Sequence, residues 1–190
     1  DEREGAIREE PLAAGAGVLR NFARSRAALL LAAIDKVQPE APLRNMTTPG
    51  GATMSVSMSN CGPLGWVSDR RGYRYEALDP SNQRSWPPMP EIFMKMAAEA
   101  AALAGYPCFR PDACLINRYQ PGARMALHQD RDEKDLGAPI VSVSLGIPAV
   151  FLFGGSARTD KPLAIPVRHG DVIVWGGPSR LFFHGVRPLK

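Results

Sequence analysis

The stretch "IVSVSLGIPAVFLFGG", residues 140–155, contains two runs of β-branched and aromatic residues separated by a glycine and a proline. Such residues fit the pleated surface of a strand, and the Gly-Ile-Pro between the runs marks the connection of two strands. Comparable segments recur from residue 112 onward: "CLINRY", "ARMALHQ", "DVIVWG" and "LFFHGV". Short strands interrupted at short intervals by Gly and Pro are typical of a sandwich or jelly roll, so residues 112–190 are predicted to form an all-β core.

Two helices are predicted ahead of this core. Ser25 can cap the first, which ends before Pro39, and the second begins with Pro90 in its first turn and closes at Gly105. The apolar stripes are Leu30, Ala33, Ile34 and Val37 in the first helix, and Phe93, Met96, Ala97, Ala100 and Ala104 in the second. Residues 16–22, "AGVLRNF", are predicted to form a short strand before them.

The segment between the helices, residues 45–89, is rich in Gly, Pro and Ser. It contains one alternating strand, "TMSVSMSN", which places Met54, Val56 and Met58 on one face. The order of elements, helices and a lid-like segment before an all-β core, indicates the fold class α+β with a β-sandwich core.

The composition is that of an ordinary globular protein. A chain of 190 residues with 45% hydrophobic residues is one domain's worth and can bury a substantial core. The net charge of +4 is compatible with a polyanionic partner without indicating one. The arginines are scattered and are interpreted as a solvated face: Arg20, Arg70, Arg71, Arg74, Arg118, Arg124, Arg158, Arg180 and Arg187.

Three further features favour a cytoplasmic protein with no membrane segment. Cys61, Cys108 and Cys114 have no C-x-x-C spacing and are expected to be reduced thiols. The N-terminal "DEREGAIREEP" is too acidic and polar for a secretory or transit peptide. The longest apolar run, "AALLLAAI", is too short to span a bilayer.

One histidine lies two residues from a carboxylate in "RMALHQDRDEKD", residues 124–135. If this segment is a strand, His128 and Asp130 leave the same face and point into one space. That space holds either a metal or a buried hydrogen bond. A distant strand histidine, His184 in "LFFHGV", would complete the two-histidine, one-carboxylate triad that suits non-haem Fe(II).

Two further residues, His169 and Asp132, could be considered as metal ligands but are interpreted differently. His169 precedes a Gly-Asp turn in "RHGDVIVWG", where a histidine usually bonds the local backbone. Asp132 lies on the side of His128 and Asp130 if the strand continues, but a third carboxylate would crowd the open metal positions. It is interpreted as a substrate contact or a rim charge.

Longer motifs carry a resemblance to a known family. They are "TPGGATMSVSMSNCGPLGW", "PDACLINRYQPGARMALHQDRDE", "APIVSVSLGIPAVFLFGG" and "HGDVIVWGGPSRLFFHGV". The chain resembles, over nearly its whole length, the AlkB family of Fe(II)- and 2-oxoglutarate-dependent nucleic-acid dealkylases. The resemblance implies a single catalytic domain, residues 1–190, with a double-stranded β-helix (jelly roll), flanking N-terminal helices and a nucleotide-recognition lid at residues 45–89.

The same resemblance implies an iron site and a cosubstrate site. Fe(II) would be held by His128, Asp130 and His184, with 2-oxoglutarate and O2 as cosubstrates. Asn117 and Tyr119 match residues that hydrogen-bond 2-oxoglutarate in the family, although a polar pair on an alternating strand also fits a solvent-facing edge.

The implied reaction is oxidative demethylation of bases such as 1-methyladenine and 3-methylcytosine, with release of formaldehyde. Single-stranded DNA is the preferred partner, with double-stranded DNA and RNA as further substrates, and the protein is expected to act as a monomer. Trp66 matches the tryptophan that stacks on the base in the family, although packing in the core is an alternative role for it. Tyr73 matches a tyrosine that contacts the substrate backbone, and Asp132 matches the acid that holds the base. Met54 and Met58 would line the pocket, and Arg158 is a candidate without an assigned role.

In the family a further strand follows the segment matched by "HGVRPLK". That strand carries an arginine that pairs with the distal carboxylate of 2-oxoglutarate and a second arginine near the site. Arg187 and Lys190 do not match these positions, so the jelly-roll core at residues 112–190 is expected to lack its last strand.

Two alternative functions stay open at this point. One is an oxygenase with the same triad that acts on protein or a small molecule. The other is a protein that binds methylated bases without turnover, which the unmatched arginines motivate.

Overall fold

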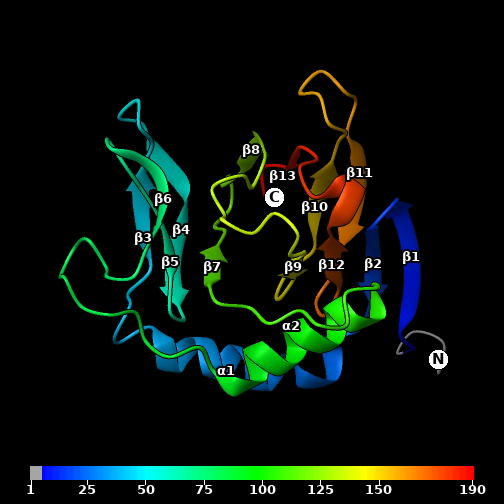
Figure 1. The fold of residues 1–190 in the computed structure, drawn as a ribbon, viewed down its shortest axis with the longest axis horizontal. Helices are drawn as coiled ribbons and strands as arrows, with labels where there is room; N and C mark the ends of the chain where they lie inside the picture. The colour runs from blue at the N-terminus through cyan, green and yellow to red at the C-terminus, as the bar shows by residue number, and fades with distance from the viewer. Residues whose placement is uncertain (1–5) are drawn as a thin grey trace.

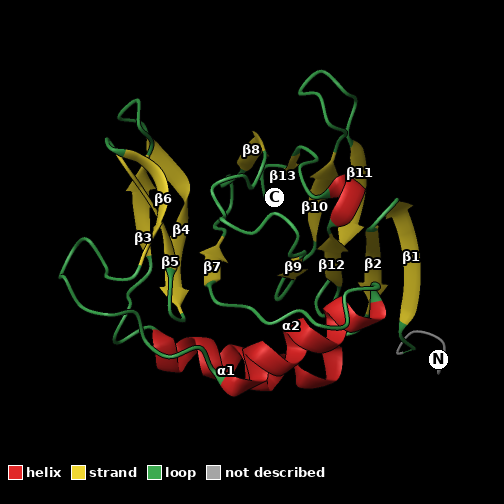
Figure 2. Ribbon diagram, viewed as in Figure 1, coloured by secondary structure: helices red, strands yellow, loops and turns green. Residues whose placement is uncertain are grey.

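The computed structural model describes residues 6–190, in which thirteen strands and two α-helices are assigned (Figures 1 and 2). The helices are α1 (Ala27–Val37) and α2 (Glu91–Leu103), with 3-10 turns at Arg24–Arg26 and Gly177–Ser179. The strands are β1 (Arg8–Ala13), β2 (Ala16–Arg20), β3 (Arg44–Thr47), β4 (Thr53–Cys61), β5 (Gly65–Asp69), β6 (Gly72–Glu76), β7 (Cys114–Arg118), β8 (Met125–His128), β9 (Ile140–Val143), β10 (Ala149–Phe153), β11 (Leu163–Val167), β12 (Val172–Trp175) and β13 (His184–Val186).

Two four-stranded antiparallel sheets form a sandwich, with strand orders β1-β2-β12-β9 and β11-β10-β13-β8. Side chains from both sheets, such as Val18, Phe153, Ile165 and Trp175, meet in one buried cluster between them. This arrangement is a jelly roll, and it confirms the predicted α+β class with a β-sandwich core.

Strand β12 explains why the helices cover the sandwich on one side. Ile173 and Trp175 point into the sandwich core, while Val172 and Val174 point to the opposite face and pack with Leu30 and other helix residues. All four residues are buried, so this strand is apolar throughout instead of alternating. Figure 1 shows α1 and α2 running together beneath the sheets.

A second group of strands lies beside the sandwich and forms the left side of Figure 1. It consists of a β3-β4-β7 sheet and the β5-β6 hairpin. Residues 45–89 contain β4, β5, β6 and most of β3. Every residue of β7 pairs with a residue of β4. Since β7 continues toward β8, it connects this group to the sandwich.

The predicted helices and strand segments all occur in the structure, but two details differ. Ser25 does not cap α1, because it lies inside the 3-10 turn and Arg26 occupies the N-cap without a side-chain hydrogen bond. Pro90 is the N-cap of α2 and precedes its first turn.

Five strands were not predicted: β1, β3, β5, β6 and β11. Their periodicity is weak because they are short or carry many charged side chains, as in "REEPLA" and "GYRYE". Strands β1 and β11 lie at sheet edges, where charged residues and proline are common because they discourage pairing with another chain.

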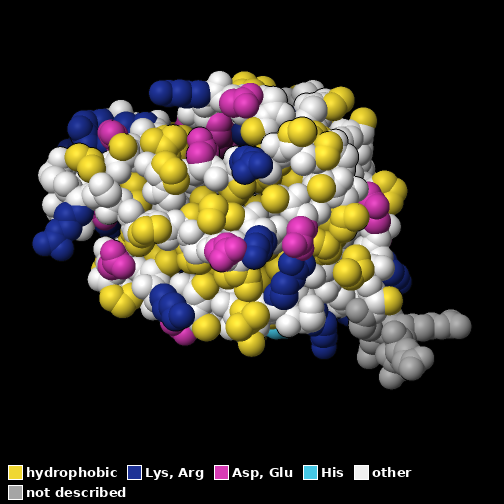
Figure 3. Space-filling model, turned by 60° about the horizontal axis from the view of Figure 1, so that its bottom comes forward, with side chains coloured by type: hydrophobic (Ala, Val, Ile, Leu, Met, Phe, Trp, Pro, Cys, Tyr) yellow, Lys and Arg dark blue, Asp and Glu magenta, His cyan; other side chains and the backbone are white. Residues whose placement is uncertain are grey.

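Charge is unevenly spread over the face shown in Figure 3. Lysine and arginine side chains gather toward the side of the molecule that holds β3–β6, while apolar and charged groups mix over the helices. Arg70 and Arg71, in the turn of the β5-β6 hairpin, are exposed. Among residues 6–190, no helix is long and apolar enough to cross a membrane.

Candidate iron and nucleotide-binding site

The two strand histidines stand directly opposite each other. His128 is the last residue of β8 and His184 the first of β13, and they are register partners in this antiparallel pair. Opposed residues of antiparallel strands project to the same face, and the two ring centroids are 4.4 Å apart. Residues that are 56 positions apart in the sequence thus share one space.

Each histidine is oriented by a backbone carbonyl. Nδ1 of His128 is 2.8 Å from the carbonyl oxygen of Ala126, and Nδ1 of His184 is 3.0 Å from that of Phe182. A carbonyl can only accept a hydrogen bond, so Nδ1 carries the proton in both rings. In the neutral form of each ring, Nε2 therefore keeps a free lone pair, as a metal ligand requires.

Asp130 faces both of these lone pairs. Its Oδ1 is 3.5 Å from Nε2 of His128 and its Oδ2 is 3.4 Å from Nε2 of His184. Burial favours the neutral carboxyl, but hydrogen bonds and charge attraction from the two histidines, which act when the rings are protonated, outweigh it and hold the pKa of Asp130 well below its usual range. Burial also opposes protonation of His128, yet the interaction with Asp130 prevails and raises the pKa of that histidine.

These residues fit a divalent cation. Their candidate ligand atoms all lie within 4.8 Å of one another, and this is the one such group of three or more among residues 6–190. Two nitrogen lone pairs and a carboxylate directed at one point repel one another unless a proton or a cation lies between them. A metal satisfies all three, and a facial set of two histidines and a carboxylate leaves coordination positions open for substrate and O2.

The third histidine lies elsewhere. Nδ1 of His169 accepts the backbone N–H of Gly146 at 2.9 Å. The prediction of a backbone-bonded histidine is therefore confirmed, although its partner belongs to a different loop rather than to its own turn.

The β5-β6 hairpin brings aromatic side chains close to this site. Trp66 and Tyr73 lie diagonally across the hairpin, with ring centroids 5.6 Å apart and planes inclined by 13°. Nε1 of Trp66 donates a hydrogen bond to Oδ2 of Asp132 at 3.2 Å. Asp132 lies two residues beyond Asp130, so an aromatic plane and a carboxylate meet beside the three candidate ligands.

The two methionines and the Asn-Tyr pair face a common apolar cluster. Val56 and Met58 are buried there, and Met54, Trp66 and Tyr119 pack against them. Asn117 is opposite Met58 in the β4-β7 register and is exposed, so it lies on the same face at the rim. Burial raises the pKa of Tyr119 to about 12, which keeps its hydroxyl protonated at neutral pH.

Arg158 lies close to the histidines. Its Nη1 donates to the carbonyl oxygen of Leu127 at 2.8 Å, and its guanidinium lies 4.9 Å above the Phe183 ring. Since Leu127 and Phe183 immediately precede His128 and His184, Arg158 connects the two histidine-bearing segments. Its charge also opposes protonation of His128, which acts to lower the pKa of that histidine.

The interpretation of the arginines as a solvated face is wrong for Arg180, which is 3% exposed. Its Nη1 donates to the carbonyl oxygen of Asp130 and its Nη2 is 3.2 Å from Oε2 of Glu133. Oε1 of Glu133 in turn accepts a hydrogen bond from the hydroxyl of Tyr75. No local pattern identifies these three residues, because their contacts join segments about 50 positions apart.

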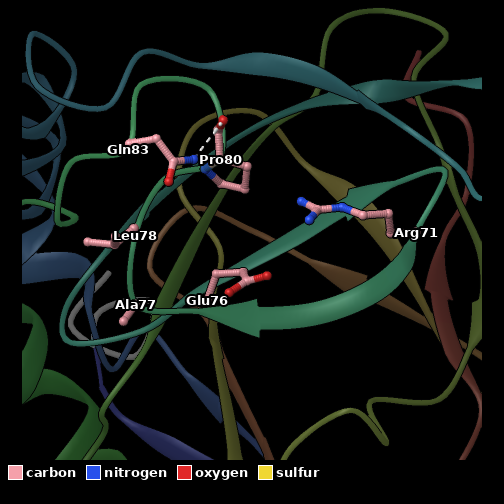
Figure 4. Close-up of a pocket in the computed structure, with 6 residues that line it drawn as sticks. All are labelled: Arg71, Glu76, Ala77, Leu78, Pro80 and Gln83. Atoms are coloured by element: carbon pink, nitrogen blue, oxygen red, sulfur yellow. Dashed lines mark hydrogen bonds between the residues drawn. The ribbon is translucent and has the colours of Figure 1, made fainter.

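A separate cavity of about 360 Å³ is lined by residues of the hairpin and of the loop that follows β6, and none of the candidate ligands lines it (Figure 4). The amide of Gln83 donates to the carbonyl oxygen of Pro80 across one side of it. It is lined by Arg71, Glu76, Ala77, Leu78, Pro80 and Gln83.

Comparison with known proteins places the chain in a family. The profile of the 2OG-Fe(II) oxygenase superfamily matches residues 15–190. Alpha-ketoglutarate-dependent dioxygenase AlkB of Escherichia coli (strain K12) is 58% identical over 96% of this chain and 84% of its own length. The tRNA demethylase abh1 of Schizosaccharomyces pombe is 32% identical over 65% of this chain and 41% of its own length. The solved structure of OsALKBH1 has a TM-score of 0.84 and 28% identity, covering 96% of this chain and 88% of that one.

The chain therefore belongs to the 2OG-Fe(II) oxygenase superfamily, whose members are Fe(II)- and 2-oxoglutarate-dependent dioxygenases. Within that superfamily it is a member of the AlkB family, and its cofactor and cosubstrates are Fe(II), 2-oxoglutarate and O2.

Proposed function

We propose that this dioxygenase removes N-linked methyl groups from bases of the 1-methyladenine and 3-methylcytosine type in nucleic acid. The observation that carries this proposal is the contact of Trp66 with Asp132 beside His128, Asp130 and His184. A methylated base requires a flat surface for stacking and an anion for its positive charge or exocyclic amino group. Both groups lie next to the candidate metal ligands here.

In this proposal His128, Asp130 and His184 hold Fe(II), and Asn117 and Tyr119 hydrogen-bond 2-oxoglutarate. The bound iron and cosubstrate supply the activation of O2 and the oxidation of the methyl carbon. The carbonyls of Ala126 and Phe182 keep the two imidazoles in the tautomer that exposes Nε2. Because the pKa of Tyr119 is about 12, its hydroxyl remains a hydrogen-bond donor across the physiological range.

The β5-β6 hairpin and the residues beside it would bind the target base. The target base has to leave its stack before its methyl group can reach the site, which costs least in single-stranded or damaged nucleic acid. Trp66 would stack on the base, Tyr73 would contact the backbone beside it, and Asp132 would accept from its amino group. Met54 and Met58 would form the adaptable apolar wall.

The proposal includes the organisation and partners of the protein. Residues 1–190 act as one catalytic domain, with residues 45–89 as the nucleotide-recognition lid. Single-stranded DNA is the preferred substrate, with double-stranded DNA and RNA as further ones. We propose a cytoplasmic monomer, and the net charge of +4 is compatible with binding to a polyanion.

The test is formaldehyde release from a single-stranded oligonucleotide with one 1-methyladenine, in the presence of Fe(II), 2-oxoglutarate, ascorbate and air. We expect release by the parent chain and none by His128→Ala. His169→Ala is the matched control, since it removes a histidine bonded to Gly146 elsewhere, and it should retain activity.

Succinate formation and binding of methylated strands, measured beside formaldehyde release, decide between this function and its two alternatives. Succinate formed without formaldehyde, and no binding of methylated strands to Mn(II)-loaded protein, would contradict the proposal and favour a protein or small-molecule substrate. Tight binding of methylated strands with no succinate or formaldehyde would favour a base-binding protein without turnover.

A further inference from the structure

Arg180 is a buried cation that contacts a single irregular segment at three points. The segment is the connection from β8 to β9, residues 129–139, and it contains Asp130 near its start. Nη1 of Arg180 donates to the carbonyl oxygen of Asp130 at 2.6 Å, and Nε donates to that of Ala138 at 2.8 Å. Nη2 is 3.2 Å from the carboxylate of Glu133. One planar guanidinium thus holds the start, the middle and the end of this segment.

The burial of Arg180 makes these contacts energetically important. A buried charge is tolerated only when it is paired and its donors are satisfied. Lysine cannot reproduce two divergent hydrogen bonds together with an ion pair to Glu133, because its ammonium is a compact charge without the planar fork. The orientation of the Asp130 backbone therefore depends on the arginine, although the arginine is not a candidate metal ligand.

Glu133 extends this network to the hairpin. Its Oε1 accepts the hydroxyl of Tyr75 at 2.9 Å, while its other oxygen faces Arg180. Burial, together with the negative charge of Glu133, raises the pKa of Tyr75 well above its usual value, so the phenol stays a donor. Tyr75 is the cross-strand partner of Trp66, so both side chains leave the hairpin on the same face.

Two parallel contacts therefore join the hairpin to the segment that carries the carboxylate ligand. Trp66 bonds Asp132, and Tyr75 bonds Glu133, the next residue along the chain. A displacement of the hairpin would move Glu133 through its bond to Tyr75, and Arg180 contacts both Glu133 and the carbonyl oxygen of Asp130.

We propose that Arg180 is a positioning residue for Asp130, and that Glu133 and Tyr75 couple the position of the β5-β6 hairpin to the geometry of the metal site. The proposal rests on the metal-binding and base-recognition roles given under the proposed function. It adds a pathway by which hairpin placement and metal affinity influence each other, and such coupling is reciprocal.

The experiment measures Mn(II) affinity in the absence of nucleic acid, from the electron paramagnetic resonance signal of free Mn(II). The full chain is compared with Arg180→Lys, Tyr75→Phe and the double variant. We expect Arg180→Lys to weaken binding about 10-fold or more, as removal of groups that orient metal ligands does. Tyr75→Phe, which lacks one hydroxyl, should weaken binding about 2- to 10-fold.

The double variant tests whether Tyr75 acts through Arg180. Its loss of affinity should be clearly smaller than the product of the two single factors, because residues of one network are not additive. Factors that multiply would overturn the proposal, since Tyr75 and Arg180 would then act independently.

Tyr106→Phe is the matched control. The hydroxyl of Tyr106 donates to the carbonyl oxygen of Gly15, also at 2.9 Å, and it lies outside the network. It should leave the Mn(II) affinity unchanged. If Tyr75→Phe has no more effect than Tyr106→Phe, the coupling does not exist.

Two further results complete the test. If Arg180→Lys does not fold, judged by circular dichroism, Glu133→Gln replaces it in the same cycle with the same expectation. A parent chain that binds Mn(II) but releases no formaldehyde contradicts the proposed function, while the Mn(II) comparison still decides on the coupling. Absence of Mn(II) binding by the parent overturns both.

Discussion

Replacement of Gly185 by alanine should damage the metal site without touching any candidate ligand. Gly185 lies on β13 between His184 and Val186, where β8 places one more residue than β13 between the paired positions. This β-bulge brings the β8 backbone unusually close. A Cβ at position 185 would lie 2.6 Å from the carbonyl oxygen of Met125 and 3.2 Å from the carbonyl group of Ala126.

The size of the effect follows from these distances. Cβ atoms essentially never approach another heavy atom within 3.0 Å, and ordinary contact begins at about 3.4 Å. Because the Cβ would lie 2.6 Å from the Met125 oxygen, β8 and β13 must separate by about 0.4–0.8 Å. The obstructing atoms are backbone, so no side chain can turn away. Because metal–ligand distances tolerate only about 0.2 Å, a separation of His128 from His184 by this amount exceeds what one ion can bridge.

We expect Gly185→Ala to weaken Mn(II) binding about 10- to 100-fold, the range seen when ligand orientation is disturbed. Overpacking of this kind should also lower the free energy of unfolding by about 1–3 kcal/mol. Isothermal titration with Mn(II) and thermal unfolding of the metal-free chain measure the two effects separately.

Gly50→Ala serves as the control. The nearest atom to a Cβ at Gly50 is Oγ1 of Thr48 at 4.0 Å, so this substitution needs no displacement. Parent-like Mn(II) affinity in Gly185→Ala would refute the reasoning, because it would mean that the two strands can separate without loss of the site.

Three further predictions concern binding and stability. Trp66→Ala should weaken binding of a methylated single strand to the Mn(II)-loaded chain about 5- to 150-fold, the equivalent of about 1–3 kcal/mol for one stacked base; unchanged fluorescence anisotropy titrations would contradict its stacking role. Tyr119→Phe should raise the KM for 2-oxoglutarate about 2- to 12-fold through one lost hydrogen bond. That factor should be constant from pH 6 to 9 because the pKa of Tyr119 is about 12, and a factor that varies over this range would count against the assignment. Asp79→Asn should reduce the free energy of unfolding at pH 7 by about 1.5–3 kcal/mol, because its carboxylate makes two 2.7 Å bonds to Arg44. Burial acts to raise the pKa of Asp79, but the bonds to Arg44 and to Ser81 outweigh it and lower that pKa, so this stabilisation is present above the pKa of the unfolded carboxyl, about 3.9, and is lost as the pH falls through the lower folded value. Urea unfolding at pH 7 and pH 3 checks the sign, and a difference between parent and variant that grows toward pH 3 would contradict it.

The apolar strands of the sandwich could be predicted from the sequence, whereas the hairpin and the edge strand could not. The segments around β9, β10 and β12 were predicted because they are apolar and β-branched, a property of a buried strand that does not depend on its partner. The hairpin β5-β6 and edge strand β1 were missed because they are short and charged residues, Gly or Pro interrupt their apolar pattern. Their strand conformation is fixed by pairing with a neighbour, which local pattern does not reveal.

The candidate site shows the same division. Local composition and motifs along the chain were enough to identify the α+β class with a β-rich core, the family, and the residue types at His128, Asp130 and His184. The three-dimensional structure was needed to show that Nδ1 of each histidine bonds a carbonyl, that Arg180 is buried and bonds the carbonyl oxygen of Asp130, and that Tyr75 bonds Glu133. Such contacts join residues far apart in the chain, so their presence depends on how the sheets and the hairpin pack together.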